Sequence, residues 1–332
     1  WLYLRRQGSA VEMFIVTLIL FSQIFDASAT GYAFLKLGVG VRPVAMGNAF
    51  TAISDDGNAV FWNPAGLGVV SNYHVAGMLM NHLTYFNYYN LTSALPVGKR
   101  GGIGLGLSYL GATDTEYSER GEDLGSFTNS DMLLNVGYGH AFGRRGVISL
   151  GGALKVVRGQ LYRYSSTGVL ADLGLLLNPV RYLYFGTVVK NLGTSRRFIE
   201  MREYPPVNFR QGVAVKLPVQ NNQLALSCDL SLYPDLKPTI AIGAEAWIRA
   251  PELLGLSGNR RITGFAVMAG YQSGYGEGTF SGFSMGFALQ VSVSEGLYLD
   301  IGALLLSYGY LGTSERVALG LNYVPSRARA SK

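Results

Sequence analysis

The chain has few of the residues from which enzymes build metal or redox centres. Among its 332 residues there is one cysteine, Cys228, and only three histidines, His74, His82 and His140. A single cysteine excludes an intramolecular disulfide and a cysteine-rich metal site. No two histidines have the H-x-x-x-H spacing of zinc ligands on one helix. We therefore expect no metal site and no cofactor.

Charge is also scarce, because Asp, Glu, Lys and Arg make up 14% of the residues, against roughly 25% in ordinary soluble domains. The net charge of +6 comes from basic residues that stand singly or in pairs. Since they form no basic patch, nucleic acid is not an expected partner. After residue 30 there is no run of eighteen apolar residues, which excludes helical membrane spans.

What the chain does have is alternation. From residue 73 to residue 324, stretches of roughly ten residues alternate apolar with small or polar side chains, as in barrel strands. The clearest stretch runs from Phe283 to Val293. We count about fourteen stretches, near residues 73–83, 86–97, 101–112, 131–142, 147–162, 166–178, 182–193, 206–218, 222–233, 238–248, 261–273, 280–293, 296–311 and 315–324. The predicted fold is all-β: a transmembrane antiparallel β-barrel of about 14 strands, spanning residues 72–325, with a tail at 326–332.

The connections predict how the barrel is oriented, because outer-membrane barrels have short periplasmic turns and longer outer loops. Tight turns follow Gly98, Gly143, Asn178 and Ser294. The longest connections, 111–130 and 193–206, fall on the opposite side and are expected to face outward. The connection 249–261 is an exception, since it is long on the side of the short turns. This pattern predicts a bacterial outer-membrane location, with membrane lipid around the barrel.

Strand parity also predicts which charged residues point into the barrel. These are Lys155, Arg210, Lys216, Asp229 and Glu245. Inside a barrel such groups pair with one another or line a narrow polar lumen. The same parity places Cys228 on the apolar outer side.

The N-terminus is typical of an export signal. Arg5 and Arg6 precede an apolar stretch, and small residues then end at Ala29. We expect residues 1–29 to be a signal peptide cleaved after Ala29. A membrane anchor is the alternative, but the apolar core of about twelve residues is short for a span.

Residues 30–71 have no sustained alternation and predict a short helical plug that finds its core inside the barrel. Asn63 followed by Pro64 is a helix-start signal, and Asp55 to Asn58 is typical of a turn. Asp55 and Asp56 would either cap turn amides or bind a cation or basic partner. Arg42 is their candidate counter-charge.

Two stretches of this segment, GVGVRPVAMGNAF and DDGNAVFWNPAGL, resemble the N-terminal signature of the PorV/PorQ family, within the wider group of FadL-like barrels. The residues that carry the resemblance include Arg42, Met46, Gly47, Asp55, Asp56, Trp62, Asn63, Pro64 and Gly66. Asn48 departs from it, since a second glycine is usual there. The resemblance implies a fourteen-stranded barrel. It also implies type IX secretion, in which the barrel accepts secreted proteins by a C-terminal sorting domain and delivers them to secretion-system subunits.

The leading hypothesis is therefore a non-enzymatic PorV-like barrel for protein secretion or surface attachment, with 111–130 and 193–206 facing cargo. The alternative is a FadL-like channel for hydrophobic small molecules such as fatty acids, since one fold serves both tasks. A lipid hydrolase is a distant third. Ser284 does lie in a G-x-S-x-G match, but inside an alternating strand and not at a strand-to-helix turn, and His140 falls on the lipid-facing side. No catalytic residue is predicted.

Overall fold

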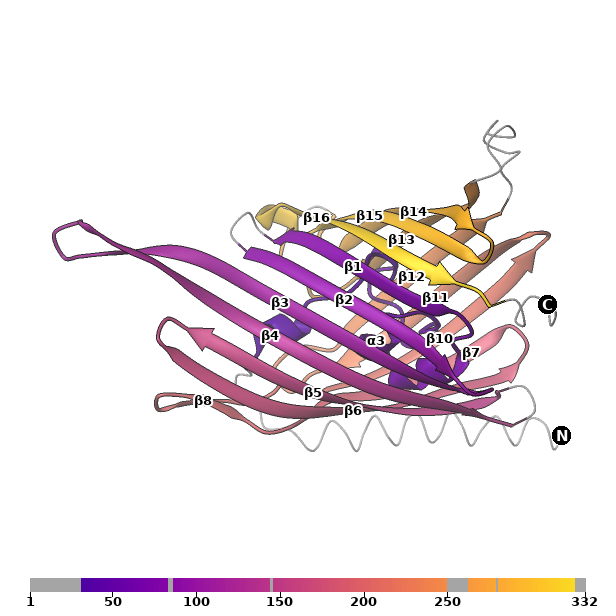
Figure 1. Ribbon diagram of the computed structural model, residues 1–332, viewed down its shortest axis with the longest axis horizontal. Coiled ribbons are helices and arrows are strands. Elements are labelled where there is room, and N and C mark those ends of the chain that lie inside the picture. Colours follow the sequence, from indigo (N-terminus) through magenta and orange to yellow (C-terminus); the bar gives the residue numbers. More distant parts are fainter. Residues whose placement is uncertain (1–30, 83–85, 144–145, 250–261, 279, 326–332) are drawn as a thin grey trace.

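The computed structural model describes residues 31–82, 86–143, 146–249, 262–278 and 280–325. Its main feature is a closed antiparallel barrel of fourteen strands in chain order, in which the last strand also pairs with the first (Figure 1). The predicted fold class is confirmed. The expected signal peptide and the tail lie outside the described residues, as does most of the connection 249–261.

The strands follow the predicted alternating stretches closely. The barrel consists of β1 (Tyr73–His82), β2 (Phe86–Val97), β3 (Gly101–Tyr117), β4 (Asp123–Phe142), β5 (Ile148–Leu161), β6 (Tyr164–Val180), β7 (Leu183–Gly193), β10 (Asn208–Val219), β11 (Asn222–Leu232), β12 (Thr239–Ile248), β13 (Ile262–Gln272), β14 (Phe283–Ser294), β15 (Leu297–Ser307) and β16 (Thr313–Tyr323).

The alternation sorts side chains between the two faces of the wall. In β14, Phe283, Met285 and Phe287 are exposed on the outside, whereas Ser284 between them is buried. An apolar outside and a polar, filled inside are what a barrel needs when lipid, and not water, surrounds it. Free Cys228 is on the outside, as its parity predicts.

The two long connections differ from the prediction. β3 and β4 remain paired as far as Tyr117 and Asp123, so the expected loop 111–130 is mostly a two-stranded ribbon that projects past the other strands (Figure 1). Cross-strand pairs such as Thr113 with Thr128, whose hydroxyls lie 3.3 Å apart, continue the ladder. The alternation of apolar residues stops there because the ribbon has left the apolar belt. The second connection contains a hairpin of β8 (Arg196–Phe198) and β9 (Met201–Glu203).

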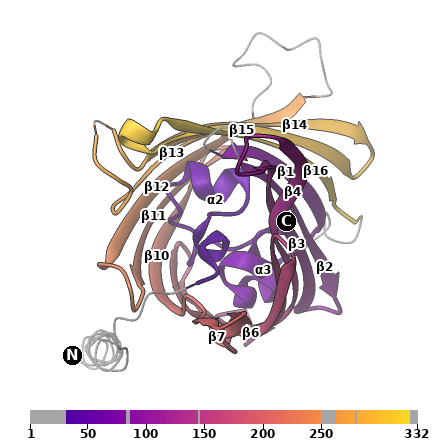
Figure 2. The same ribbon diagram turned by 90° about the vertical axis from the view of Figure 1, so that its left-hand side faces the viewer.

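The plug lies inside the ring of strands (Figure 2). It consists of η1 (Ala33–Lys36), α2 (Val41–Ala45), α3 (Ala59–Trp62) and η2 (Pro64–Val69). Among the described residues, no helix is long and apolar enough to cross a membrane. The hydrophobic core sits between plug and wall. Fully buried plug side chains form its centre, namely Val44, Met46, Phe50, Val60 and Leu67.

Inward-facing glycines of the wall make room for the plug. A Cβ at Gly151 would lie 2.3 Å from the carbonyl carbon of Pro64, and one at Gly106 would lie 2.3 Å from the ring of Phe61. Contacts that short are forbidden, so the wall approaches the plug with its backbone. The glycine-rich composition thus has a packing role at these positions.

Candidate functional site: the plug and its cavities

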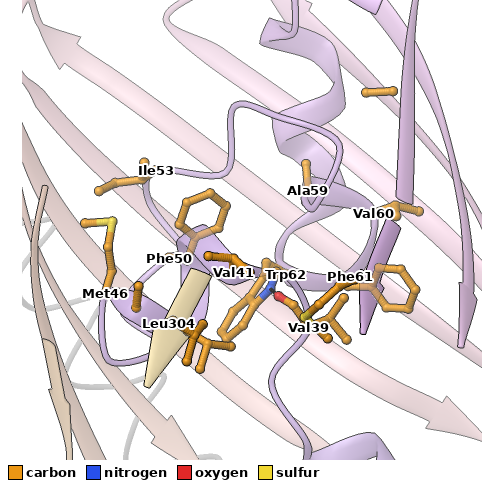
Figure 3. Close-up of a cluster of buried hydrophobic side chains, with 14 of the residues drawn as sticks. Val39, Val41, Met46, Phe50, Ile53, Ala59, Val60, Phe61, Trp62 and Leu304 are labelled. Atoms are coloured by element: carbon orange, nitrogen blue, oxygen red, sulfur yellow. Dashed lines mark hydrogen bonds between the residues drawn. The ribbon is translucent and has the colours of Figure 1, made fainter. Parts of the chain in front are cut away.

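The plug has only short helices, and hydrogen bonds between side chains and the backbone stabilise its shape. Trp62 Nε1 donates to the Val39 carbonyl at 2.9 Å, which ties α3 to the chain ahead of α2 (Figure 3). Asn63 Oδ1 accepts from Ala65 N at 3.2 Å, and Pro64 begins η2, so the predicted helix start is confirmed. Asn63 Nδ2 donates to the Thr51 carbonyl inside the plug and to the Leu175 carbonyl of the wall.

An ion-pair network joins the plug to the wall around Arg42. Its guanidinium lies 2.6 Å from Asp55 Oδ1 and 3.0 Å from Asp56 Oδ2, and it forms two bonds to Glu245 of β12. Asp55 in turn accepts from Lys216 of β10 at 2.6 Å. Asp56 also accepts from the amide of Asn58, so it closes the turn and pairs with Arg42 at the same time.

The network fixes the charge of its members. Burial raises the pKa of Asp55, but the charges of Arg42 and Lys216 outweigh this, so its pKa lies well below its ordinary value. Burial alone would lower the pKa of Arg42, but Asp55, Glu245 and Asp56 raise it well above the ordinary value. The plug is therefore charged on this side at neutral pH.

The other three inward charges hold the plug or the adjoining wall. Asp229 accepts from the amides of Phe50 and Thr51 at 3.1 and 2.9 Å and from the Thr51 hydroxyl at 2.6 Å. Arg210 donates to Asp229 and to the Asn48 carbonyl. Lys155 pairs with Asp172 at 2.6 Å. The plug or neighbouring wall residues thus engage all five charged residues that were predicted to face inward.

The remaining signature residues lie where plug and wall touch. Gly47 has a φ of 63°, and a Cβ there would lie 2.3 Å from the Tyr271 amide nitrogen. The Gly47 amide donates to Ser284 Oγ, which donates to the Ala45 carbonyl at 3.0 Å. Met46 is fully buried against Gly243 of the wall. Gly66 packs on Ser54, where a Cβ would lie 1.9 Å from the carbonyl oxygen. Ser284, the serine of the hydrolase pattern, thus anchors the plug.

Several residues of this interface escaped the sequence analysis. Arg316 of β16 is 1% exposed and donates to the Gly38 carbonyl. The alternation of β16 could have placed it inside. Arg196 of β8 pairs with Asp131 and Glu203 and lies over the ring of Tyr32, 4.3 Å from its centroid. Nothing in the sequence connects that hairpin to the plug.

The plug separates two cavities inside the barrel. The smaller one, of about 50 Å³, faces the end with the long connections. Its wall combines polar groups with apolar and aromatic side chains, and the apolar contributors are Phe34, Leu35, Leu37, Val39, Phe61, Trp62, Tyr88 and Leu133. Lys36, Lys155, Lys190 and Arg210 add positive charge to its wall. We call it the outer cavity.

The inner cavity, of about 290 Å³, lies beyond the Arg42 network, towards the short turns. Arg42, Asp55, Asp56 and Glu245 form its boundary with the plug. Among the described residues, no three His, Cys, Asp or Glu side chains are placed to hold a metal ion. The site is thus an ion-paired barrier between two cavities, each of which is lined by both polar and apolar side chains.

The architecture has solved counterparts, although the sequence has none among known families. No protein-family model matches the chain, and no curated protein matches it. The TodX monoaromatic hydrocarbon channel, as its deltaS2S3 mutant, is similar with a TM-score of 0.59 at 11% identity over 87% of this chain and 99% of that one. The toluene transporter TbuX of Ralstonia pickettii has a TM-score of 0.55 at 13% identity over 86% and 97%. A FadL homologue of Pseudomonas aeruginosa has a TM-score of 0.50 at 9% identity over 86% and 98%.

At such low identity the similarity shows the fold. The chain is a closed fourteen-stranded antiparallel β-barrel that shares the fold of these structures, and this fold together with the apolar outer face places it in a bacterial outer membrane. The resemblance of the plug segment to the PorV/PorQ family has no counterpart among these comparisons and remains a prediction.

Proposed function

We propose that the protein is a plugged outer-membrane channel for small hydrophobic molecules, and that it is not an enzyme. The observation that carries the proposal is the pair of cavities inside a membrane barrel, where plug and wall together present apolar side chains, with aromatic ones such as Phe61 and Trp62 in the outer cavity. The solved barrels of this shape that are described as channels or transporters for monoaromatic hydrocarbons or toluene support the same class of ligand.

Passage requires that the plug move. All neighbouring strands of the barrel are paired, so the described wall offers no break between strands. The barrier between the outer and inner cavities is the plug with its Arg42 network. A hydrophobic molecule would enter from the end with the long connections, settle against Trp62 and Phe61, and pass when the plug shifts.

The test is uptake of radiolabelled toluene and oleate by cells that express this protein and lack their own hydrophobic-compound channels. Leu133→Trp would fill the outer cavity from β4, since Leu133 is 4% exposed and lines it. The matched control is Leu134→Trp, the same change on the adjacent, lipid-facing residue, which is 46% exposed. We expect uptake with the wild type and the control, and a several-fold loss with Leu133→Trp. No uptake with the wild type, or equal uptake with both variants, would contradict the proposal.

A second candidate function is protein secretion, favoured by the resemblance of residues 31–70 to the PorV/PorQ signature. In this reading the outer ribbon 111–130 and the hairpin region 193–206 contact secreted proteins or secretion-system subunits. Deleting the gene and comparing the surface proteome with hydrocarbon uptake separates the two. Lost surface proteins with unchanged uptake would favour secretion, and the reverse would favour the channel.

A further inference from the structure

A groove at the mouth of the barrel, on the side of the short turns, adjoins the inner cavity and shares Gln223 and Arg249 with its lining. It has a volume of about 550 Å³, within the usual range of small-molecule sites. The ends of β7, β10, β11 and β12 form it. Three cations line it: Arg181 after β6, Lys216 of β10 and Arg249 after β12. The side chains of Tyr182 and Tyr184 and a group of amide side chains complete it, so its surface can bind anions, rings and hydroxyl groups.

Two of these cations have no carboxylate partner in the described part of the chain. The described ion pairs include neither Arg181 nor Arg249. The Arg181 guanidinium lies over the Tyr182 ring, 5.4 Å from its centroid, which leaves its donors available to a ligand. The positive charges of Arg181 and Arg249 in this groove therefore have no neutralising carboxylate among the described residues.

The third cation already has an anionic partner, and that partner belongs to the plug. Lys216 Nζ lies 2.6 Å from Asp55 Oδ2 and 4.7 Å from the centroid of the Tyr184 ring. The lysine side chain is 12% exposed and lines the groove, so a solute there can reach it, whereas Asp55 lines the inner cavity. Asp55 also holds Arg42, whose other partner is Glu245 of β12. The Lys216–Asp55 pair is thus one of the ties between plug and wall.

We propose that this groove binds a small organic anion, a carboxylate or phosphate attached to a ring or short chain, and that the bound anion competes with Asp55 for Lys216. Arginine forms paired hydrogen bonds with both kinds of anion, and the tyrosines offer rings for the organic part. Two anions repel each other when they share one ammonium, so binding in the groove weakens the tie between Asp55 and the wall. The groove is a regulatory site that loosens the plug from the periplasmic side, distinct from the outer cavity proposed for the transported compound.

The binding test measures, by calorimetry, the binding of phenyl phosphate to the full chain in nanodiscs. Inorganic phosphate and phenol are titrated separately, so that the contributions of the anionic group and of the ring to binding can be compared. We expect saturable binding of phenyl phosphate, weaker binding of phosphate, and a loss of affinity of about tenfold or more in the double variant Arg181→Gln/Arg249→Gln. Lys99→Gln removes a charge from an exposed turn at the same end, outside the groove, and should bind as the wild type does. Absence of saturable binding, or equal affinity in wild type and double variant, overturns the site.

The competition is tested by hydrogen exchange of plug peptides that include Asp55 to Asn58. Saturating phenyl phosphate should speed exchange there in the wild type. Lys216→Gln should show fast exchange without the probe and no further increase with it, whereas Lys216→Arg should behave as the wild type does. Exchange that is unchanged or slower with the probe overturns the competition. These measurements need no transported compound, so they succeed or fail independently of the uptake experiment.

Discussion

Arg42 and Glu245 face each other through two parallel hydrogen bonds, from Nε to Oε1 at 2.7 Å and from Nη2 to Oε2 at 2.8 Å. They are 203 positions apart in the chain. A two-bond guanidinium–carboxylate pair fixes orientation as well as distance, so this contact sets how α2 sits against β12. The same guanidinium holds Asp55 and Asp56, which makes it the central group of the barrier between the two cavities.

Replacing Arg42 with Met should release the plug without unfolding the barrel. Three carboxylates would lose their shared cation, and removing one partner from a buried ion pair costs on the order of 3 kcal/mol. We expect a rise in single-channel conductance in planar bilayers and faster proteolysis of the plug. Arg158→Met, at an exposed position on β5, is the control and should leave both unchanged. A closed, protease-resistant plug in the Arg42 variant would show that the network is dispensable.

Replacing Asn63 with Ala should destabilise the plug, because one side chain supplies a helix cap and two donors to buried carbonyls. Leaving those groups unpaired costs about 1 to 3 kcal/mol each at most. Asn63→Asp keeps the cap but not the donors, so it should recover only part of the loss. Thermal unfolding followed by the fluorescence of Trp62 measures this. Asn87→Ala, at an exposed strand position, should not shift the transition. A transition for Asn63→Ala equal to that of the wild type would refute the role.

Replacing Gly47 with Ala should prevent the plug from seating. Both Gly47, with a φ of 63°, and Gly98, with a φ of 65°, are left-handed, so alanine strains the backbone equally at each. Only at Gly47 would the new Cβ also meet the wall, 2.3 Å from the Tyr271 amide, since nothing lies within 4 Å of a Cβ at Gly98. We expect the Gly47 variant to leak large antibiotics across the outer membrane, and the Gly98 variant to remain tight. Equal leakage would mean that backbone strain alone matters.

The plug should stay attached over most of the acidic range. Because the pKa of Asp55 in the folded protein is lowered from its ordinary value of about 3.8, its contribution is complete above that value and is lost as pH falls through the folded pKa. Hydrogen exchange of residues 55–58 should therefore be constant from pH 7 to about 4, after correction for intrinsic rates, and rise only below it. Asp55→Asn should remove this acid-dependent part. A rise between pH 7 and 5 in the wild type would contradict the assignment to Asp55.

The sequence by itself determined the wall of this protein. Strand number, strand bounds and the inward placement of residues such as Lys155 and Asp229 follow from a period of two, because in a barrel each strand meets only its neighbours and its own two faces. The alternation ends where no apolar belt imposes it, so it predicts a loop beyond Gly111 where the structure has a paired ribbon. The Asn63 cap and the turn at Asp55 were also predictable, since they depend on residues within three positions of each other.

Only the tertiary structure decided which wall residues bind the plug and where the plug separates the two cavities. Arg42 with Glu245, Thr51 with Asp229 and Tyr32 with Arg196 are contacts between residues far apart in the chain, and no local pattern encodes such distances. The role of the inward glycines also depends on distant residues. Gly151 and Gly106 leave room for Pro64 and Phe61, which belong to another segment. Partners brought together by closure of the barrel are fixed by its register and circumference, and these exist only once all fourteen strands are paired.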